Sequence, residues 1–123
     1  MTRLIGAIAC ALVLGTIAAP AANADDVGRP TQFCESTKLC VWWDSHYGGS
    51  RYIFGGNNAS WGAWSIEDDD SSTYNNGTSG LRVATYTNPS GTGTRIVCLP
   101  MGSWASHHSP NDSGSSNYWL SAC

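Results

Sequence analysis

The chain has few basic residues and no basic cluster. Its 123 residues include six Lys and Arg against nine Asp and Glu. Proteins that bind nucleic acid neutralise phosphates with grouped Lys and Arg side chains, and anionic membrane surfaces attract the same groups. The composition therefore indicates that neither a nucleic acid nor a membrane is a partner.

The sequence also lacks the residue patterns of the common catalytic sites. It contains no Gly-x-Ser-x-Gly turn, no His-Glu-x-x-His pair and no paired carboxylates in a catalytic frame. The three histidines are His46, His107 and His108, and the last two are adjacent, so on an extended chain they point to opposite faces. We therefore expect a protein that is not an enzyme.

Only one long apolar run is present, and it lies at the start of the chain. It follows a basic residue and precedes the small-x-small sequence Ala22-Asn23-Ala24, an arrangement typical of a secretory signal peptide. We expect residues 1–24 to be removed on export and residues 25–33 to form a short flexible segment. Residues 34–123 are long enough for one domain, which we expect to be soluble and extracellular.

Four of the five cysteines follow the leader, and an even number in an oxidising compartment favours two disulfides. The order of the cysteines leaves three connectivities open. We favour Cys34–Cys40, because these residues close a short local loop, and Cys98–Cys123, because the last residue then gains a tether. In the chain-entropy description the two bonds stabilise the fold by about 2.5 and 3.5 kcal/mol.

The rest of the sequence shows no sustained helical spacing of apolar residues. Apolar and β-branched residues instead form short runs, which Gly, Asn, Asp, Ser or Pro separate at intervals typical of hairpins. These runs predict an all-β sandwich or barrel, with a polar loop over residues 106–117. The expected strands cover residues 39–43, 51–54, 61–66, 81–87, 94–99 and 118–120.

One of the expected hairpins carries the frame aromatic-x4-aromatic-x-Gly, at Trp42, Tyr47 and Gly49. In a folded hairpin of this kind the second ring packs over the bend, and glycine supplies a backbone angle that a Cβ would obstruct. A second copy begins at Tyr86, but Gly91 stands where its second ring should be. We therefore expect glycine to be required at position 49 and not at position 91.

This frame resembles the hairpin motif of βγ-crystallin Greek keys. Around it, Cys34-x5-Cys40 runs directly into the first expected strand, residues 75–79 precede the second strand pair, and Cys98 ends a later strand. Together with the leader, this layout resembles the secreted actinobacterial peptidase inhibitor family of the Streptomyces metalloproteinase inhibitor. The resemblance implies a small βγ-crystallin-like Greek-key sandwich stabilised by two disulfides. It also implies an inhibitor of extracellular proteases that needs no cofactor, which we expect to be a monomer.

The resemblance assigns a protease-binding loop as well. In the inhibitor that gives the family its name, this loop is a rigid exposed turn that begins at a disulfide-bonded cysteine. The matching residues here are Cys98, Leu99 and Pro100. Leu99 would fill an apolar pocket of a metalloprotease, and the disulfide and Pro100 would hold the loop rigid. The alternative is that these residues only end a core strand.

Calcium is the metal that the resemblance suggests, because microbial βγ-crystallins bind it through an Asn/Asp-Asn/Asp-x-x-Ser/Thr-Ser loop. Residues 75–80 match five of its six positions, which makes Asn75, Asn76 and Ser79 the candidate ligands. Both leading residues are neutral amides, whereas calcium prefers several charged oxygens, so we expect only weak binding. The alternative for this stretch is a simple turn.

Six tryptophans in so short a chain also suggest stacking on a carbohydrate, with Trp61 and Trp64 as candidates. Residues three apart cannot share one face of a regular strand, so core packing explains these rings as well. A secreted antimicrobial or killer-toxin-like protein of the same fold is a further alternative, without a residue signature of its own.

Overall fold

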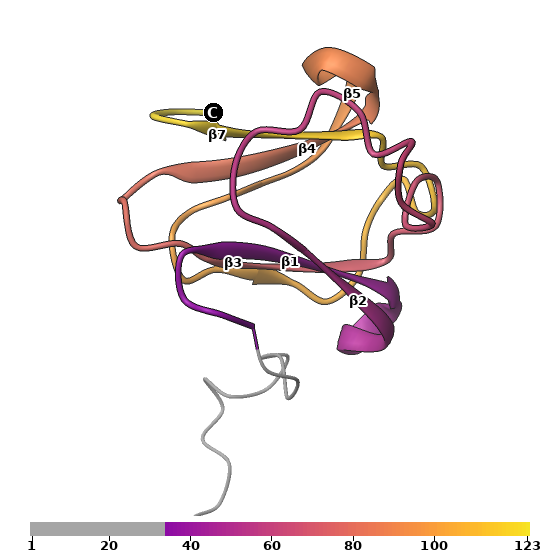
Figure 1. Cartoon of the computed structure of the whole chain (residues 1–123), viewed down its shortest axis with the longest axis horizontal. Helices are drawn as coiled ribbons and strands as arrows, with labels where there is room; N and C mark the ends of the chain where they lie inside the picture. Colours follow the sequence, from indigo (N-terminus) through magenta and orange to yellow (C-terminus); the bar gives the residue numbers. More distant parts are fainter. Residues whose placement is uncertain (1–33) are drawn as a thin grey trace, which may run out of the picture.

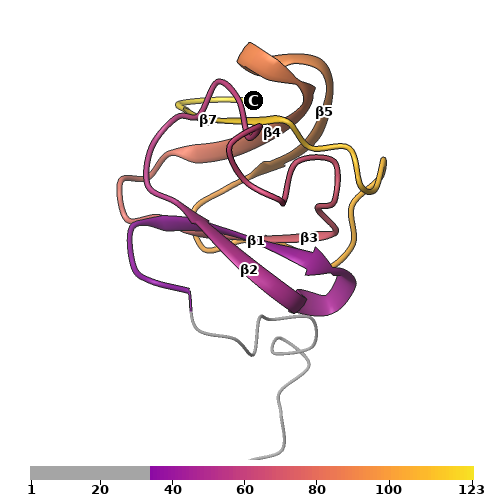
Figure 2. The same ribbon diagram turned by 45° about the vertical axis from the view of Figure 1, so that its right-hand side comes forward.

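Residues 34–123, which the computed structural model describes, form two antiparallel sheets. The strand order is β2-β1-β3-β6 in the first sheet and β5-β4-β7 in the second. Figures 1 and 2 show the two sheets stacked face to face as a sandwich. The expected leader, residues 1–24, and the segment 25–33 lie outside the described residues. The strands are β1 (Lys38–Asp44), β2 (Gly48–Phe54), β3 (Ser72–Asn76), β4 (Arg82–Asn88), β5 (Thr92–Leu99), β6 (Trp104–Ala105) and β7 (Ser116–Leu120).

The connections interlock the two halves of the chain as two Greek keys. β1, β2 and β3 belong to the first half, yet β6 from the second half completes their sheet by pairing with β3. In return Asn58, which follows β2, forms a bridge to Asn117 in β7 of the second sheet. Each sheet therefore contains backbone from both keys, and the expected all-β Greek-key sandwich is confirmed.

The first hairpin, between β1 and β2, has the geometry that its frame predicts. The rings of Trp42 and Tyr47 meet edge to face, with centroids 5.3 Å apart. Gly49 has a φ of 70°, in the left-handed region that favours glycine. His46 and Tyr47 also have positive φ angles, so two of the three residues of the bend Ser45–Tyr47 lie in the left-handed region before β2 begins.

The second hairpin, between β4 and β5, keeps the same backbone and obtains its missing ring from elsewhere. Gly91 has a φ of 67°, close to the 61° of Tyr47, its counterpart in the first hairpin. A Cβ at Gly91 would lie 3.2 Å from the ring of Tyr118, which packs edge to face on Tyr86. Tyr118 comes from β7 and covers the bend in place of the absent side chain. The expectation that position 91 does not require glycine is therefore wrong, because this ring already fills the space.

A buried serine secures each hairpin in the same way. In both hairpins the serine hydroxyl accepts a hydrogen bond from a main-chain N–H of the bend, that of Tyr47 in the first and of Gly91 in the second. The same hydroxyl donates to the carbonyl of the last residue of the strand before the bend. Two hydrogen bonds per serine fix the bend relative to a strand that follows much later in the chain. The bonds run from Tyr47 N to Ser72 Oγ and on to Asp44 O (3.0 and 2.7 Å), and from Gly91 N to Ser116 Oγ and on to Asn88 O (3.1 and 2.7 Å).

β1 is buried on both of its faces. Alternate residues of a strand point to opposite sides of the sheet, so Leu39 and Val41 face the second sheet while Cys40 and Trp42 face outward. The molecule consequently has an inner core between the sheets and a second apolar cluster on the outer face of the first sheet. The inner core contains Leu39, Val41, Phe54, Trp61, Ile66 and Val83, and the outer cluster contains Cys34, Cys40, Trp42 and Tyr47.

Residues 61–66 form consecutive turns rather than the expected strand. Trp64 N donates to the Trp61 carbonyl at 2.8 Å, and Trp61 and Ile66 are both fully buried. Residues five apart in a strand point to opposite faces, so a strand could not bury both side chains in one core. The turns satisfy the local main-chain groups and direct both side chains inward.

The two disulfides join Cys34 to Cys40 and Cys98 to Cys123. This is the pairing that the cysteine positions favour. The first bond lies in the outer cluster, and the second ties the end of β5 to the last residue of the chain. Disulfides of this kind fit a protein that works outside the cell.

Replacing Tyr47 with phenylalanine is expected to leave the fold intact and to change its response to alkali. The Tyr47 hydroxyl is buried, and it has no hydrogen-bond partner among the described residues. Burial raises the pKa of Tyr47 to about 12, above the ordinary value of 10.0. Ionisation therefore favours the unfolded chain, and the stability held below pH 10 is lost as the pH rises toward about 12.

Urea unfolding of the wild type and of Tyr47→Phe, at pH 7 and in steps from pH 9 to about 12, measures this effect. The variant should equal or exceed the wild type at pH 7, since it no longer buries an unpaired hydroxyl. It should also lose less stability in the alkaline range. A clear loss of stability at pH 7 would show that the hydroxyl is hydrogen-bonded in solution.

Candidate functional site

The end of β5 leads into a tight exposed turn. β5 ends at Leu99, one residue after the disulfide-bonded Cys98. Ser103 N then donates to the Pro100 carbonyl at 3.0 Å, which closes a four-residue turn. Gly102, at its third position, has a φ of 77°, and glycine adopts this angle without strain. Gly102 is therefore suited to its place in this turn, and Pro100, the first residue of the turn, ends the pairing of β5 because it has no N–H.

Asn75 of β3 holds this turn to the body of the protein. The side chain is fully buried, and its main-chain carbonyl accepts a bond from Gly102 N at 2.8 Å. Its own N–H donates to the Ser103 carbonyl at 2.9 Å, and its Nδ2 donates to the Leu99 carbonyl at 2.8 Å. Three bonds from one buried residue thus fix both ends of the turn, which limits the entropy that the turn could lose on binding a partner.

The three residues of the expected protease-binding loop lie in different environments. Leu99 pairs with Val83 in the sheet and packs against the inner core, while Cys98 is partly buried and Pro100 is exposed. The large exposed apolar side chain nearest to this loop is Met101, which is 49% exposed. Sequence reasoning passed over Met101, although a Pro-x-Gly turn after a disulfide-bonded cysteine is a signal for an exposed residue at x.

The expected calcium ligands lie at the end of β3 and in its connection to β4, where their side chains are hydrogen-bonded to main-chain groups. Asn75 Oδ1 accepts from Gly77 N at 2.9 Å, and Asn76 Nδ2 donates to the Cys34 carbonyl at 2.6 Å. Ser79 Oγ accepts from Leu81 N at 3.4 Å. The bonds of Asn75 and Ser79 stabilise a turn, and the bond of Asn76 anchors the first disulfide loop. Calcium binding by Asn75, Asn76 and Ser79 stays a prediction.

A second acidic arrangement comes from two segments with the same Asp-x-x-Ser-Ser frame, residues 68–72 and 112–116. Each leading aspartate has a positive φ, donates its N–H to a carbonyl of the other segment, and accepts a bond from a serine hydroxyl there. We call these the crossed segments. The bonds are Asp68 N to Gly114 O (2.9 Å), Ser115 Oγ to Asp68 Oδ1 (3.5 Å), Asp112 N to Asp70 O (3.0 Å) and Ser71 Oγ to Asp112 Oδ1 (3.2 Å).

Sequence reasoning missed the crossed segments, although their common frame could have identified them. Their oxygen atoms are of the kind that calcium prefers, namely carboxylates, hydroxyls and main-chain carbonyls. Within residues 34–123, no cluster of three or more His, Cys, Asp or Glu side chains is arranged to hold a metal. Any cation here would therefore depend on main-chain and serine oxygens as well.

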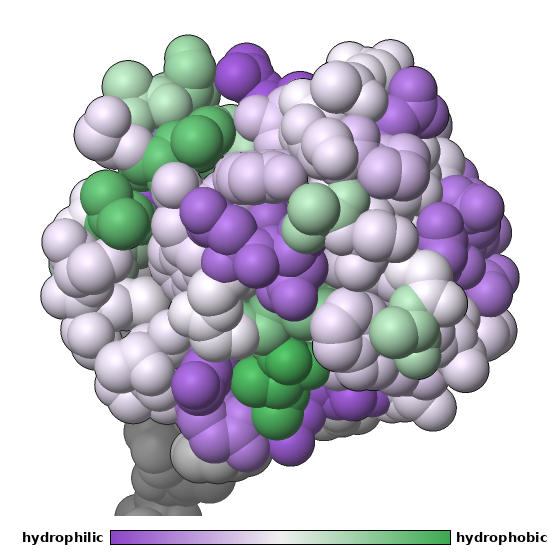
Figure 3. Space-filling model, turned by 45° about the horizontal axis from the view of Figure 1, so that its top comes forward, coloured by the Kyte–Doolittle hydropathy of each residue, from purple (hydrophilic) through white to green (hydrophobic). Residues whose placement is uncertain are grey.

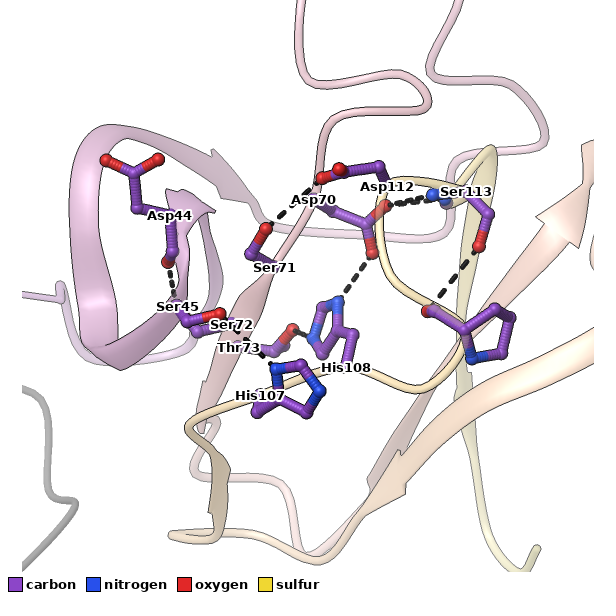
Figure 4. A network of polar contacts seen from close by, with 12 residues as sticks. Asp44, Ser45, Asp70, Ser71, Ser72, Thr73, His107, His108, Asp112 and Ser113 are labelled. Carbon is purple, nitrogen blue, oxygen red and sulfur yellow. Dashed lines mark hydrogen bonds and ion pairs between the residues drawn. The ribbon is translucent and has the colours of Figure 1, made fainter.

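A buried polar network lies between the crossed segments (Figure 4). Asp70 Oδ2 is 2.7 Å from His108 Nδ1, and the other ring nitrogen of His108 is hydrogen-bonded to the Thr73 hydroxyl. Asp70 Oδ1 also accepts the N–H groups of Ser113 and Gly114, at 3.1 and 2.5 Å. The Asp70, Thr73 and His108 side chains are all excluded from solvent. The expected polar loop over residues 106–117 is thus pinned to β3 through His108.

Asp70, His108 and Thr73 follow the order carboxylate, imidazole, hydroxyl of a hydrolytic triad. Because all three side chains are buried, they cannot act on a substrate as such a triad does. A nucleophilic hydroxyl has to reach a substrate carbonyl, with donors for the oxyanion nearby. The Thr73 hydroxyl points into the protein from the middle of a sheet and is fully buried. The network is a structural clamp.

The two tryptophans considered for carbohydrate stacking do not form a common surface. Trp61 is fully buried and stacks on Phe54, whereas Trp64 is 42% exposed and meets Phe54 by its edge. Across residues 34–123, no helix has the length and apolar character that crossing a membrane requires.

Comparison with solved structures shows the same fold in βγ-crystallin domains. A structure named "Evolution of the eye lens beta-gamma-crystallin domain fold" has a TM-score of 0.63 and 15% identity, over 73% of this chain and 91% of that chain. A βγ-crystallin from Ciona intestinalis has a TM-score of 0.58 and 14% identity, over 68% and 99%. A double mutant of a βγ-crystallin domain from Clostridium beijerinckii has a TM-score of 0.55 and 24% identity, over 71% and 100%.

No curated protein sequence matches the chain significantly. The sequence profile of peptidase inhibitor family I36, however, matches residues 28–99. These residues make up more than half of the chain and include the first disulfide loop and the strands β1 to β5. The chain therefore belongs to peptidase inhibitor family I36, built on a βγ-crystallin-like sandwich with two disulfides.

Proposed function

We propose that the protein is a secreted inhibitor of an extracellular metalloprotease, which it binds through the loop at Cys98, Leu99 and Pro100 and the turn that follows. The observation that carries this proposal is the anchoring of that turn, whose two ends are bonded to the buried Asn75. The Cys98–Cys123 disulfide adds a covalent tether at the start of the loop.

An inhibitor of this kind needs no catalytic group. It has to offer main chain in the shape of a substrate and to lose little conformational entropy on binding. The Leu99 side chain packs on the inner core, so it anchors the loop, while the exposed main chain beyond it is available to the protease. The family and the apolar residues of the loop favour a thermolysin-like target, whose specificity pocket accepts apolar side chains.

Titration of the exported protein against a panel of metalloproteases and serine proteases tests the proposal. We expect stoichiometric inhibition of at least one metalloprotease, with and without calcium. The paired change Cys98→Ser with Cys123→Ser should weaken inhibition, while Cys34→Ser with Cys40→Ser removes the disulfide that includes no residue of the loop and serves as its matched control. Absence of inhibition across the panel would refute the function.

A second candidate function is weak calcium binding, which we place at the crossed segments rather than at residues 75–80. The supporting observation is their reciprocal geometry, in which each of two exposed aspartates faces a serine hydroxyl and a carbonyl of the other segment. Two carboxylates are few for a high-affinity calcium site, so the binding should be weak.

Asp112→Ala should abolish the rise in melting temperature that calcium causes in the wild type, because it removes one of the two carboxylates. Asn76→Ala is the matched control, since it deletes an amide of the other candidate loop and should leave the calcium-dependent rise unchanged. Differential scanning calorimetry with calcium or magnesium measures both. The opposite pattern would return the site to the loop at 75–80.

A further inference from the structure

Large apolar side chains are rarely exposed on this protein. Among the described residues, four of them stand out: Trp43, Ile53, Trp64 and Met101, at 37%, 38%, 42% and 49% exposure. On the face that Figure 3 presents, apolar residues form small separate patches among polar ones. Scattered single apolar residues are normal on a surface, so exposure alone does not distinguish Met101 from the others.

The backbone around Met101 does distinguish it. Trp43 and Ile53 lie within paired strands, and Trp64 rests its edge on Phe54, whereas Met101 stands at the second position of the Pro100–Ser103 turn. No hydrogen bond within the described part of the chain uses the main-chain N–H or carbonyl of Met101. The turn thus presents, from a fixed support, a flexible apolar side chain together with a main-chain N–H and carbonyl of the same residue that are free to bind, which is what a substrate residue presents to a protease cleft.

The other Greek key provides an internal comparison. Phe54 and Leu99 hold equivalent places, because each ends the second strand of its hairpin and each packs into the inner core. Gly55 and Gly56 follow Phe54, whereas Pro100 and Met101 follow Leu99. The first key shows that the fold closes here without any side chain. The methionine in the second key is therefore not required for folding.

We propose that Met101 is the residue whose side chain enters the apolar specificity pocket of the target peptidase. This inference rests on the proposed function and deepens it. Leu99 holds the loop from inside, and Met101 provides the contact outside. Methionine is unbranched and adaptable, so the matching pocket is deep, apolar and tolerant of leucine.

Two substitutions, tested side by side, separate the contact residue from the anchor. Met101→Ala should raise the inhibition constant about ten- to a hundredfold, which corresponds to the loss of one buried apolar side chain, while the melting temperature stays unchanged. Met101→Leu should inhibit nearly as well as the wild type. Leu99→Ala should lower the melting temperature and, assayed well below it, change the inhibition constant only a few-fold.

If the wild type inhibits and Met101→Ala inhibits equally well, the assignment of Met101 is overturned while the proposed function stands. If the wild type inhibits no protease of the panel, the function itself fails and the inference falls with it.

Oxidation gives an independent measurement on the unmutated protein. The chain has two methionines, and Met1 belongs to the expected leader, so Met101 is the one thioether of the exported protein. Hydrogen peroxide transfers one oxygen atom to its sulfur, forming the sulfoxide, and is itself reduced to water. The polar sulfoxide should weaken inhibition at least tenfold, and Met101→Leu should resist the same treatment. Full inhibition by protein that mass spectrometry shows to be oxidised at Met101 would overturn the proposal.

Discussion

Replacing Asp70 with alanine is expected to lower the free energy of unfolding by about 3–5 kcal/mol, a large part of the stability of a domain of this size. The substitution leaves the fully buried His108 without its carboxylate partner. It also leaves the N–H groups of Ser113 and Gly114 without an acceptor in the protein interior. Urea unfolding followed by tryptophan fluorescence measures the change.

Asp69→Ala is the matched control for Asp70→Ala. The two residues are neighbours and carry the same charge, but no side-chain bond joins Asp69 to another described residue. Its substitution should change stability by less than about 0.5 kcal/mol, as expected for a position near the surface. Equal effects of the two substitutions would mean that the clamp contributes little and that only the net charge of the segment matters.

Trp61→Ala should destabilise the protein by about 3–5 kcal/mol, the usual range for deleting a large buried aromatic side chain. Trp61 is fully buried, its ring lies parallel to that of Phe54 with centroids 5.1 Å apart, and its Nε1 donates to Asn117 Oδ1 at 2.9 Å. The substitution removes the stacking and also leaves a buried amide oxygen with one donor fewer. Thermal unfolding by circular dichroism provides the measurement.

Trp64→Ala is the control for Trp61→Ala, because Trp64 is an exposed tryptophan close to the same core residue, Phe54. The ring of Trp64 meets that of Phe54 edge to face and is 42% exposed, so Trp64→Ala should cost less than about 1 kcal/mol. If a polysaccharide column retained the wild type and released Trp64→Ala, the carbohydrate alternative would gain support. If Trp64→Ala destabilised the fold as much as Trp61→Ala, the exposed position assigned to Trp64 would be incorrect.

The sequence predicted those structural features that depend on residues close together in the chain. The spacing of Trp42, Tyr47 and Gly49 determines a bend within one hairpin, so its rings and its glycine angle could be predicted. The ring that covers Gly91 could not, because Tyr118 reaches it from the last strand. A frame that looks degenerate in sequence is therefore complete in space.

β3 escaped prediction because its burial does not depend on apolar side chains. Its sequence is STYNN, and the serine, the threonine and the first asparagine are all fully buried. Each is paired in the interior: Ser72 secures a hairpin, Thr73 meets His108, and Asn75 holds the exposed turn. Patterns of hydrophobicity cannot identify a strand whose interior contacts are hydrogen bonds to distant segments.

The protease-binding loop at residues 98–100 stays a prediction, and the exposed Met101 lies directly beside it. The position of Cys98 located the loop, but which neighbouring side chain faces the core depends on the register of β5 against β4, where Leu99 pairs with Val83. That register contains irregularities between Thr85 and Asn88, and short sequence patterns do not reveal these. The exposed Met101 therefore emerged only from the structure.

The exchange of strands between the two keys also bears on how such a chain arose. Cut at the connection from β3 to β4, either half would retain its hairpin but lack the segment that completes its sheet, β6 for the first half and the region of Asn58 for the second. A lone key could bury its apolar face only against another copy of itself, as in a symmetric homodimer. The present chain has the architecture of such a dimer made covalent, and its two halves do not have to be identical: Gly55-Gly56 follows β2 in one, and Pro100-Met101 follows β5 in the other.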